Sequence, residues 1–276
     1  MNFFKERCVA LREKDYTLAE IMRATGRSKT SVYFHIRNIP LSAKRQQLIR
    51  EATIVRARAY SRSRKGKSVR AFRTFNQWSA DMVLLIAHLS FDGDIVRGEC
   101  IYNNRSIALI ERVERLMCKL YDYAPRRYLD VHSGVTKTCY FNVALDAYLQ
   151  RKAKDLFGRV DTFPRPLKRE FLRAFFDDEG CMDFRPESNR RKVRGYQKDV
   201  RILKIIQKLL TDFSIDAKVV TPNEVVITGK ENLLRFEREI NFSPGVYING
   251  KRSNSRWKKH LEKRQILRMA IESFQS

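Results

Sequence analysis

The sequence has 276 residues, enough for one domain and a smaller module, and 43% of them are hydrophobic, which excludes an intrinsically disordered chain. It carries 56 Lys and Arg against 31 Asp and Glu, a formal charge of +25, which indicates a polyanionic partner. Charge alone does not distinguish DNA from RNA or from an acidic membrane surface.

The cysteines and the hydropathy of the sequence indicate in which cellular compartment the protein is expected. The five cysteines are scattered and form no CxxC pair, so a zinc knuckle is not expected and a reducing environment fits. The first residues do not have the pattern of a secretory leader, so none is expected, and the sequence contains no apolar run of about 18 residues. The sequence therefore predicts a soluble protein of the cytoplasm or of an organellar matrix, with no membrane partner.

Residues 1–40 predict a helix-turn-helix segment. Thr17 and Glu20 have the spacing of a capping box, so a helix is expected to begin there. Gly26 fits the tight turn between helices, and Ser28 can cap a second helix carrying Val32 and Ile36 on one face. An ordinary helical hairpin would need the same residues.

The second of these helices presents short polar and basic side chains that suit a DNA major groove. The predicted DNA contacts here are Lys29, Thr30, Ser31, Tyr33 and Arg37.

Residues 41–76 are interpreted as a basic linker. Between Lys44 and Arg73 the chain holds eleven Lys or Arg and one acid, Glu51, with little apolar periodicity. Such a segment can follow DNA phosphates or a minor groove, or it can be a solvated tether. The predicted DNA contacts of the linker are Arg64, Lys65 and Lys67.

An internal repeat is the most specific signal in the sequence. LLIAHLSFDGDI (84–95) and FLRAFFDDEGCM (171–182) share one template, in which Asp92 matches Glu179. Each is followed by two strand-like runs, a helix, two further strand-like runs and a final helix. The order αββαββα, found twice, predicts an α+β fold with repeats at 77–160 and 161–243, followed by a basic C-terminal helix within 244–276 that packs across the halves or contacts phosphates.

The two dodecamers resemble the motifs of LAGLIDADG homing endonucleases, and ITGKENLLRFEREINFSP resembles the end of that family's repeat. The resemblance covers roughly residues 77 to 243. It implies two pseudo-symmetric units with saddle-shaped antiparallel sheets in one monomeric, intron-encoded chain. It also implies site-specific cleavage of a long, pseudo-palindromic double-stranded DNA target.

The chemistry follows from the helix ends. Ala87 and Ala174 are small enough to let two helices pack closely, so Asp92 and Glu179 are expected to meet at the end of the interface. At ~5 Å and an effective dielectric of 20 their charges would repel by about 3 kcal/mol, which creates a demand for a cation. Carboxylate oxygens suit Mg²⁺ or Mn²⁺, with Ca²⁺ as a non-catalytic substitute.

The resemblance selects Asp92 and Glu179 over the neighbouring acids Asp94, Asp177 and Asp178. The predicted metal site comprises Asp92, Glu179 and the adjoining Gly93 and Gly180. Lys230 matches a basic residue that the family often carries after its fourth strand, and it joins the two acids as a predicted catalytic residue. His88 and Ser90 depart from the apolar and acidic residues usual in the first motif.

The strands are expected to contact DNA through one free sheet face. The predicted contacts are Arg97, Tyr102, Arg126, Arg127, His132 and Lys137 in the first half, and Arg185, Arg190, Lys192, Arg194 and Lys218 in the second. Two alternatives to a nuclease stay open, an RNA maturase that binds intron RNA and a DNA-binding regulator that does not cleave.

Overall fold

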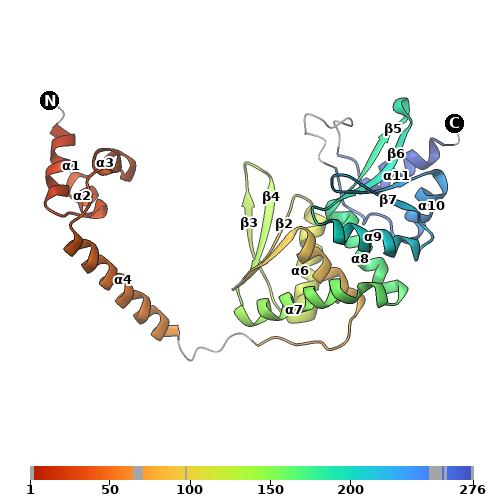
Figure 1. Ribbon diagram of the computed structural model, residues 1–276, viewed down its shortest axis with the longest axis horizontal. Coiled ribbons are helices and arrows are strands. Elements are labelled where there is room, and N and C mark those ends of the chain that lie inside the picture. Colours follow the sequence, from red (N-terminus) through yellow and green to blue (C-terminus); the bar gives the residue numbers. More distant parts are fainter. Residues whose placement is uncertain (1–2, 65–70, 97, 249–256, 258–259, 275–276) are drawn as a thin grey trace. The chain divides into compact units, whose positions relative to one another are not determined.

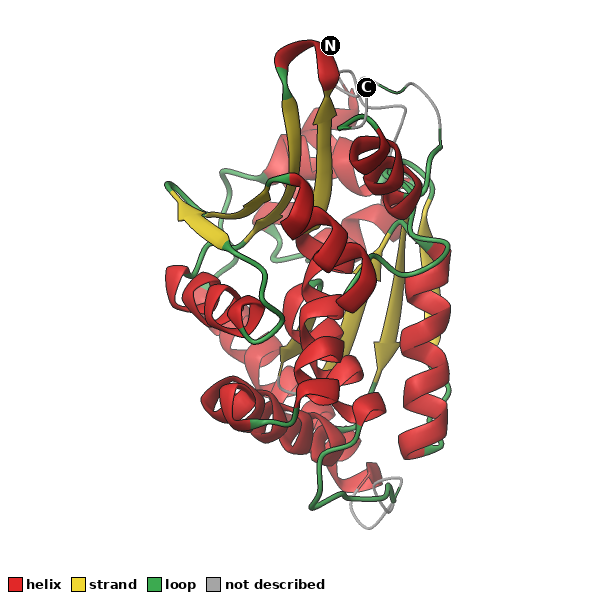
Figure 2. Cartoon of the chain, turned by 90° about the vertical axis from the view of Figure 1, so that its right-hand side faces the viewer, coloured by secondary structure: helices red, strands yellow, loops and turns green. Residues whose placement is uncertain are grey.

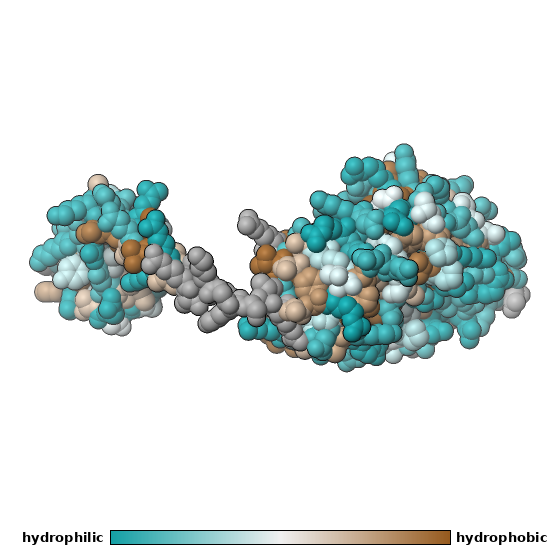
Figure 3. Space-filling model, turned by 90° about the horizontal axis from the view of Figure 1, so that it is seen from below, coloured by the Kyte–Doolittle hydropathy of each residue, from teal (hydrophilic) through white to brown (hydrophobic). Residues whose placement is uncertain are grey.

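The computed structural model describes residues 3–64, 71–96, 98–248, 257 and 260–274 (Figure 1). Two compact units make up the chain, Met1–Ser68 and Val69–Ser276. On the face shown in Figure 3, hydrophilic residues cover most of each unit. None of the helices among the described residues combines the length and the apolar composition that a membrane crossing demands.

The smaller unit is helical. Its elements are α1 (Phe3–Glu13), α2 (Leu18–Thr25), α3 (Lys29–Ile36) and α4 (Ala43–Arg64). The capping box of Thr17 and Glu20 is formed, Gly26 ends α2 with φ 66°, and Ser28 caps α3. The small core consists of Cys8, Ile21, Val32 and Ile36. The predicted helix, glycine turn and helix are therefore confirmed as structure.

The predicted linker differs from the structure in two ways. Residues 43–64 form the helix α4, and none of its described side chains is buried. A helix that is polar all round gives no apolar stripe to read, although its Ala, Arg, Gln and Leu residues favour helix. Farther on, Phe75 exchanges hydrogen bonds with the Tyr148 hydroxyl (2.9 and 3.1 Å), so the last residues of the predicted linker belong to the larger unit.

The larger unit contains the repeat twice. The first copy is α5 (Ala80–Phe91), β1 (Gly93–Val96), β2 (Glu99–Asn104), α6 (Ile107–Tyr121), β3 (Arg126–Asp130), β4 (Val135–Tyr140) and α7 (Val143–Arg159). The second is α8 (Arg165–Glu179), β5 (Gly180–Arg185), β6 (Arg190–Tyr196), α9 (Val200–Thr211), β7 (Ala217–Val220), β8 (Glu224–Thr228) and α10 (Lys230–Glu239). Short 3₁₀ turns lie at Val160–Thr162 and Pro186–Ser188. The αββαββα order is confirmed.

The two sheets have the same topology. Their strand orders are β1-β2-β4-β3 and β5-β6-β8-β7, and every pairing is antiparallel. Helices pack on one face of the strands (Figure 2), and α5 lies against α8, α6 and α7. One hydrophobic core runs through both repeats, so they form a single body.

The C-terminal helix belongs to the second repeat. It is α11 (Lys263–Glu272), and it packs against α10, β5 and β6. The expectation of a helix in this region is confirmed, and its position against one half replaces the expected packing across both.

Candidate active site

The two helices that end in the predicted acids lie side by side. Ala87 of α5 and Ala174 of α8 are both fully buried at this seam, as the close approach of two helices requires. Beside them the rings of Phe91 and Phe175 meet with centroids 5.3 Å apart. The sequence prediction that these helices pack together is confirmed.

The glycine after each acid is required by close packing rather than by a left-handed backbone. A Cβ at Gly93 would lie 2.3 Å from the carbonyl oxygen of Leu89, and one at Gly180 would lie 2.4 Å from that of Phe176. Gly180 has φ −96°, which any residue adopts. The chain therefore leaves each helix directly into a strand, with the acid at the junction.

Asp92 ends α5 in a largely buried position. Burial, with the charges of Asp178 and Glu179, raises the pKa of this carboxyl to about 8. Lys263 and a 2.7 Å hydrogen bond from Nδ2 of Asn104 to Oδ2 act in the opposite direction. The dependence on Glu179 indicates that the two acids share one electrostatic environment.

Glu179 is the corresponding residue at the end of α8. Burial and the charge of Asp178 raise its pKa to about 7, and Lys263 opposes the shift. The charge of Glu179 in turn contributes to the raised pKa of Asp92. Both carboxyls would gain from a cation close by.

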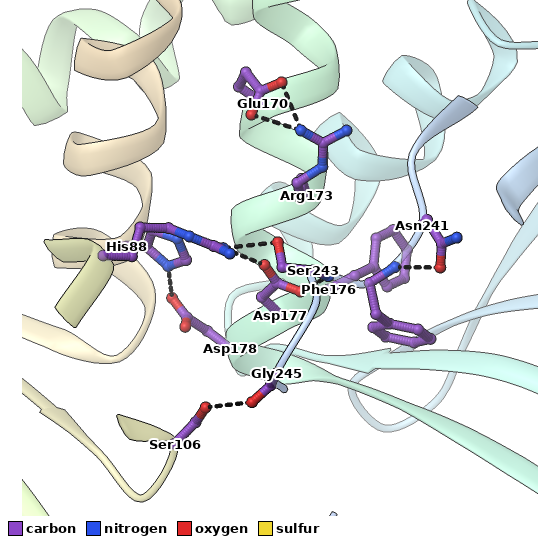
Figure 4. Close-up of polar contacts among 12 residues, drawn as sticks. His88, Ser106, Glu170, Arg173, Phe176, Asp177, Asp178, Asn241, Ser243 and Gly245 are labelled. Carbon is purple, nitrogen blue, oxygen red and sulfur yellow. Dashed lines mark hydrogen bonds and ion pairs between the residues drawn. The ribbon is translucent and has the colours of Figure 1, made fainter. Parts of the chain in front are cut away.

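Asp178 turns away from this pair and into the seam. Its Oδ2 lies 2.8 Å from Nδ1 of His88 (Figure 4). Its Oδ1 accepts a 2.7 Å hydrogen bond from the Tyr102 hydroxyl. The side chains of His88 and Asp178 are both fully buried. His88 replaces the apolar residue usual in the first motif, and Asp178 of the second motif supplies its polar partner. The two repeats therefore satisfy each other's buried polar groups.

Asp177 serves as a second link between the repeats. Nη1 of Arg112, on α6, donates to Oδ2 of Asp177 at 2.9 Å and to the Ser243 hydroxyl at 2.7 Å. The backbone N–H of Ser243 donates to the other Asp177 oxygen at 2.8 Å. This buried arrangement, seen in Figure 4, gives Asp177 a structural role.

Lys263 is a cation beside the acids that sequence reasoning missed. It begins α11, and its Nζ donates to the carbonyl oxygens of Asp177 (2.6 Å) and Phe176 (3.4 Å) in the last turn of α8. Burial lowers the pKa of this ammonium, and the acids around it counteract that shift. Its position at a helix start 84 residues after Glu179 leaves no local signal in the sequence.

The structure does not bring Lys230 to the acids. Gly180 pairs with Gly195, which pairs with Val225, so Val225 is the point of β8 level with the end of α8. Lys230 begins α10 beyond the end of β8, and Thr228 is already roughly 10 Å along the sheet from Val225 at 3.3 Å per residue. Lys263, in contrast, lowers the pKa of both carboxyls.

The second sheet gathers all five of its predicted DNA contacts on the face away from the helices. Arg185 pairs with Arg190, and the pairing of the strands places the side chains of Lys192, Arg194 and Lys218 on the same face of the sheet. On the opposite face lie buried residues such as Val193. In this sheet, the alternation of side chains along each strand was enough to predict the DNA-facing residues, because the buried residues between them mark the face that the helices cover.

The first sheet requires two corrections. Lys137 pairs with Asn103 and Tyr128, which places it on the free face, whereas Tyr102 pairs with Thr138 on the covered face and is fully buried. Arg127 also lies on the covered side and pairs with Glu114 of α6. Neither Tyr102 nor Arg127 faces the expected DNA surface.

The other predicted contacts have simpler positions. Arg126 lies two residues from Tyr128 on β3 and therefore on the same, free face of the sheet. His132 is exposed in the β3–β4 turn. Arg97, Lys65 and Lys67 lie outside the described residues, and so does the side chain of Arg64.

The smaller unit presents its predicted contacts to solvent. Lys29, Thr30, Ser31, Tyr33 and Arg37 are all exposed on or next to α3.

The donor chemistry fits a divalent cation shared with a ligand. Asp92 and Glu179 offer hard carboxylate oxygens, and their pKa values are raised first by burial and then by neighbouring carboxylates. Within the described part of the chain, no group of three or more His, Cys, Asp or Glu forms a metal site by itself. Phosphate and water oxygens would have to complete the coordination.

A family model described as a LAGLIDADG-like domain matches residues 166–241. No curated protein matches the chain. Among solved structures, a variant of the homing endonuclease I-DmoI aligns with 14% identity and a TM-score of 0.47, covering 60% of this chain and 92% of that one.

Two further solved structures are similar to this chain. I-DmoI in complex with DNA and Mn gives 13% identity and a TM-score of 0.44, with 58% of this chain and 96% of that chain covered. Full-length DUF199/WhiA from Thermatoga maritima gives 17% identity and a TM-score of 0.46, with 63% and 59% covered.

Proposed function

The chain carries a LAGLIDADG-like domain at residues 166–241, and from this premise we propose that it is a metal-dependent endonuclease that cuts double-stranded DNA. The observation that carries the proposal is that Asp92 and Glu179 lie at the ends of two helices packed side by side, where burial and neighbouring carboxylates raise the pKa of each acid. Such a pair of acids is costly without a cation, and carboxyls with perturbed pKa values cluster at functional sites.

The two acids would hold the cation together with the scissile phosphate, with Gly93 and Gly180 adjoining them. When bound, Mg²⁺ or Mn²⁺ would activate a water molecule and stabilise charge on the phosphate oxygens. Asn104 holds Oδ2 of Asp92 by its hydrogen bond, and Lys263 favours the ionised form of both acids. Ca²⁺ would bind in the same place without supporting cleavage.

DNA would lie across the free faces of the sheets. Basic residues of the second sheet share this face, and Arg126, His132 and Lys137 supply contacts from the first. Their side chains can neutralise phosphates and reach base edges in a major groove. A single chain with two repeats would act on its long target as a monomer.

The smaller unit would add a second DNA contact. The exposed residues of α3 suit a major groove, and the described part of α4 carries basic side chains including Lys44, Arg50 and Arg56 with no covering element in its unit. Because phosphate contacts govern the salt dependence of binding, removal of residues 1–68 should weaken DNA affinity and leave cleavage chemistry intact.

The test uses a plasmid library with random inserts, because the target sequence is unknown. The wild-type chain with Mg²⁺ should linearise a subset of plasmids, and sequencing of the ends would identify the site. Asp92→Asn and Glu179→Gln should abolish cutting and keep affinity for that site within about tenfold. Asp212→Asn, which alters a half-exposed acid paired with Lys168, is the matched control.

A binding protein without cleavage is the second candidate. The observation in its favour is Lys263, a buried ammonium that already balances part of the charge on both acids. Site-specific DNA binding without cutting in Mg²⁺ or Mn²⁺ would support that function. Splicing of a host intron RNA that survives both acid substitutions would support the maturase instead.

A further inference from the structure

A chain of hydrogen bonds links the buried His88 to the proposed metal ligand Asp92. From the His88–Asp178 pair the chain passes to the Tyr102 hydroxyl, which accepts a 3.3 Å hydrogen bond from Nδ2 of Asn104. Nδ2 of Asn104 also donates to Oδ2 of Asp92 at 2.7 Å. The chain starts on α5, crosses to α8 and returns through β2 to the end of α5.

The orientation of Asn104 within this chain is fixed. Its Oδ1 accepts a 2.8 Å hydrogen bond from the backbone N–H of Ser106, which can only donate. The amide nitrogen must therefore face Asp92 and Tyr102. Because an NH₂ group only donates, it favours an ionised Asp92 in one fixed rotamer.

Asp178 is a firm anchor for the other end. Its side chain is fully buried, and its two oxygens are engaged separately by His88 and Tyr102. A buried carboxylate with both oxygens satisfied has little freedom to rotate. Tyr102 is itself fully buried on the covered face of β2, so its hydroxyl is held in place.

We propose that Tyr102 and Asn104 are positioning residues for Asp92, and that the His88–Asp178 pair anchors them across the two repeats. This inference rests on the proposed metal-dependent function. The proposal explains why a histidine replaces the usual apolar residue at position 88. Through Asp178, the second repeat then helps to hold the Asp92 carboxylate of the first repeat in place. Outer residues that orient metal ligands in this way commonly matter for metal affinity.

The experiment measures Mn²⁺ binding to the full chain by electron paramagnetic resonance, with Mn²⁺ alone as the probe. Asn104→Ala should weaken the Asp92-dependent site about tenfold or more, and Tyr102→Phe should weaken it several-fold. The double variant should bind about as weakly as Asn104→Ala alone, because Tyr102 acts through Asn104. Thermal melts would verify that each variant is folded at the assay temperature.

Tyr140→Phe is the matched control, since Tyr140 is a buried tyrosine on the covered face of neighbouring β4 and lies outside this chain of contacts. The inference is overturned if Tyr102→Phe binds Mn²⁺ as Tyr140→Phe does, if the two effects simply add, or if the wild type has no Asp92-dependent site. Plasmid cleavage is scored separately. Mn²⁺ binding as expected without cutting would reject the nuclease and retain the positioning role.

Discussion

Nδ1 of His88 lies 2.8 Å from Oδ2 of Asp178, and the two residues belong to different repeats. When Asp92 is matched with Glu179, the equivalent residues are Phe175 and Phe91, whose rings are also in contact. The seam thus holds a polar pair at one position and an aromatic pair at the position related by the pseudo-dyad. The two copies have diverged in a complementary way.

The buried polar pair predicts a non-additive effect on stability. His88→Leu should lower the free energy of unfolding by about 3 kcal/mol, because one Asp178 oxygen loses its partner inside the protein. Adding Asp178→Leu should recover part of that loss. Urea unfolding would measure both, with Arg201→Ala at the exposed Asp199 pair as a nearly neutral control. Additive losses would contradict the coupling.

The acids predict a pH dependence of the metal-free protein. Their folded pKa values of about 8 for Asp92 and about 7 for Glu179 exceed those of an unfolded chain. The folded state therefore keeps protons that the unfolded state releases near pH 4, so the free energy of unfolding falls as pH rises from about 5 to 8.

The slope would reach at most about 1.4 kcal/mol per pH unit for each acid. Asp92→Asn should flatten the decline and make the protein more stable than the wild type at pH 8. Denaturant unfolding with a chelator present, repeated across this range, measures the slope. Parallel curves for the two proteins would argue against a buried Asp92 with a raised pKa.

Substitution of Lys263 and substitution of Lys230 are expected to have different effects on cleavage and on stability. Lys263→Met removes the cation that favours ionised Asp92 and Glu179, so the pH midpoint of cleavage should move upward. It also leaves carbonyls at the end of α8 without their donor, at a cost of about 1–3 kcal/mol. Lys230→Met should change neither. A loss of cleavage confined to Lys230→Met would instead support its catalytic role.

Adjacent basic residues on β6 provide a test of the DNA face. Lys192 lies on the free face, whereas Arg191 points to the other side and bonds the hydroxyl of Ser273. Lys192→Ala should reduce the slope of log affinity against log salt by about 1 if it contacts a phosphate. Arg191→Ala should leave that slope unchanged, and equal effects would contradict the assigned face.

Much of the fold could be predicted because its signals are local. Thr17, Gly26 and Ser28 are residue types that favour helix ends, so they locate the helices of the smaller unit. The repeated motif, with the strand-like runs after each copy, predicted both seam helices and both sheets. The paired acids followed from the same repeat. These features depend on residues that are neighbours in the sequence.

The remaining site residues depend on contacts between distant segments. Arg126 and Arg127 are consecutive on β3 and point to opposite faces, so only one of them could lie on the free face. Tyr102 was assigned to the wrong face because an isolated strand does not say which side the helices cover. Asn104 and Lys263 reach the acids only after the sheet and α11 are in place. No periodicity in the sequence encodes those contacts.

The unequal seam also limits how this protein can assemble. In a homodimer built from the second repeat alone, each Asp178 would face a copy of Phe175, leaving two buried carboxylates with an aromatic ring for a neighbour. A homodimer of the first repeat would set His88 against Phe91 in the same way. Neither half is self-complementary at this seam, so each repeat requires the other as its packing partner.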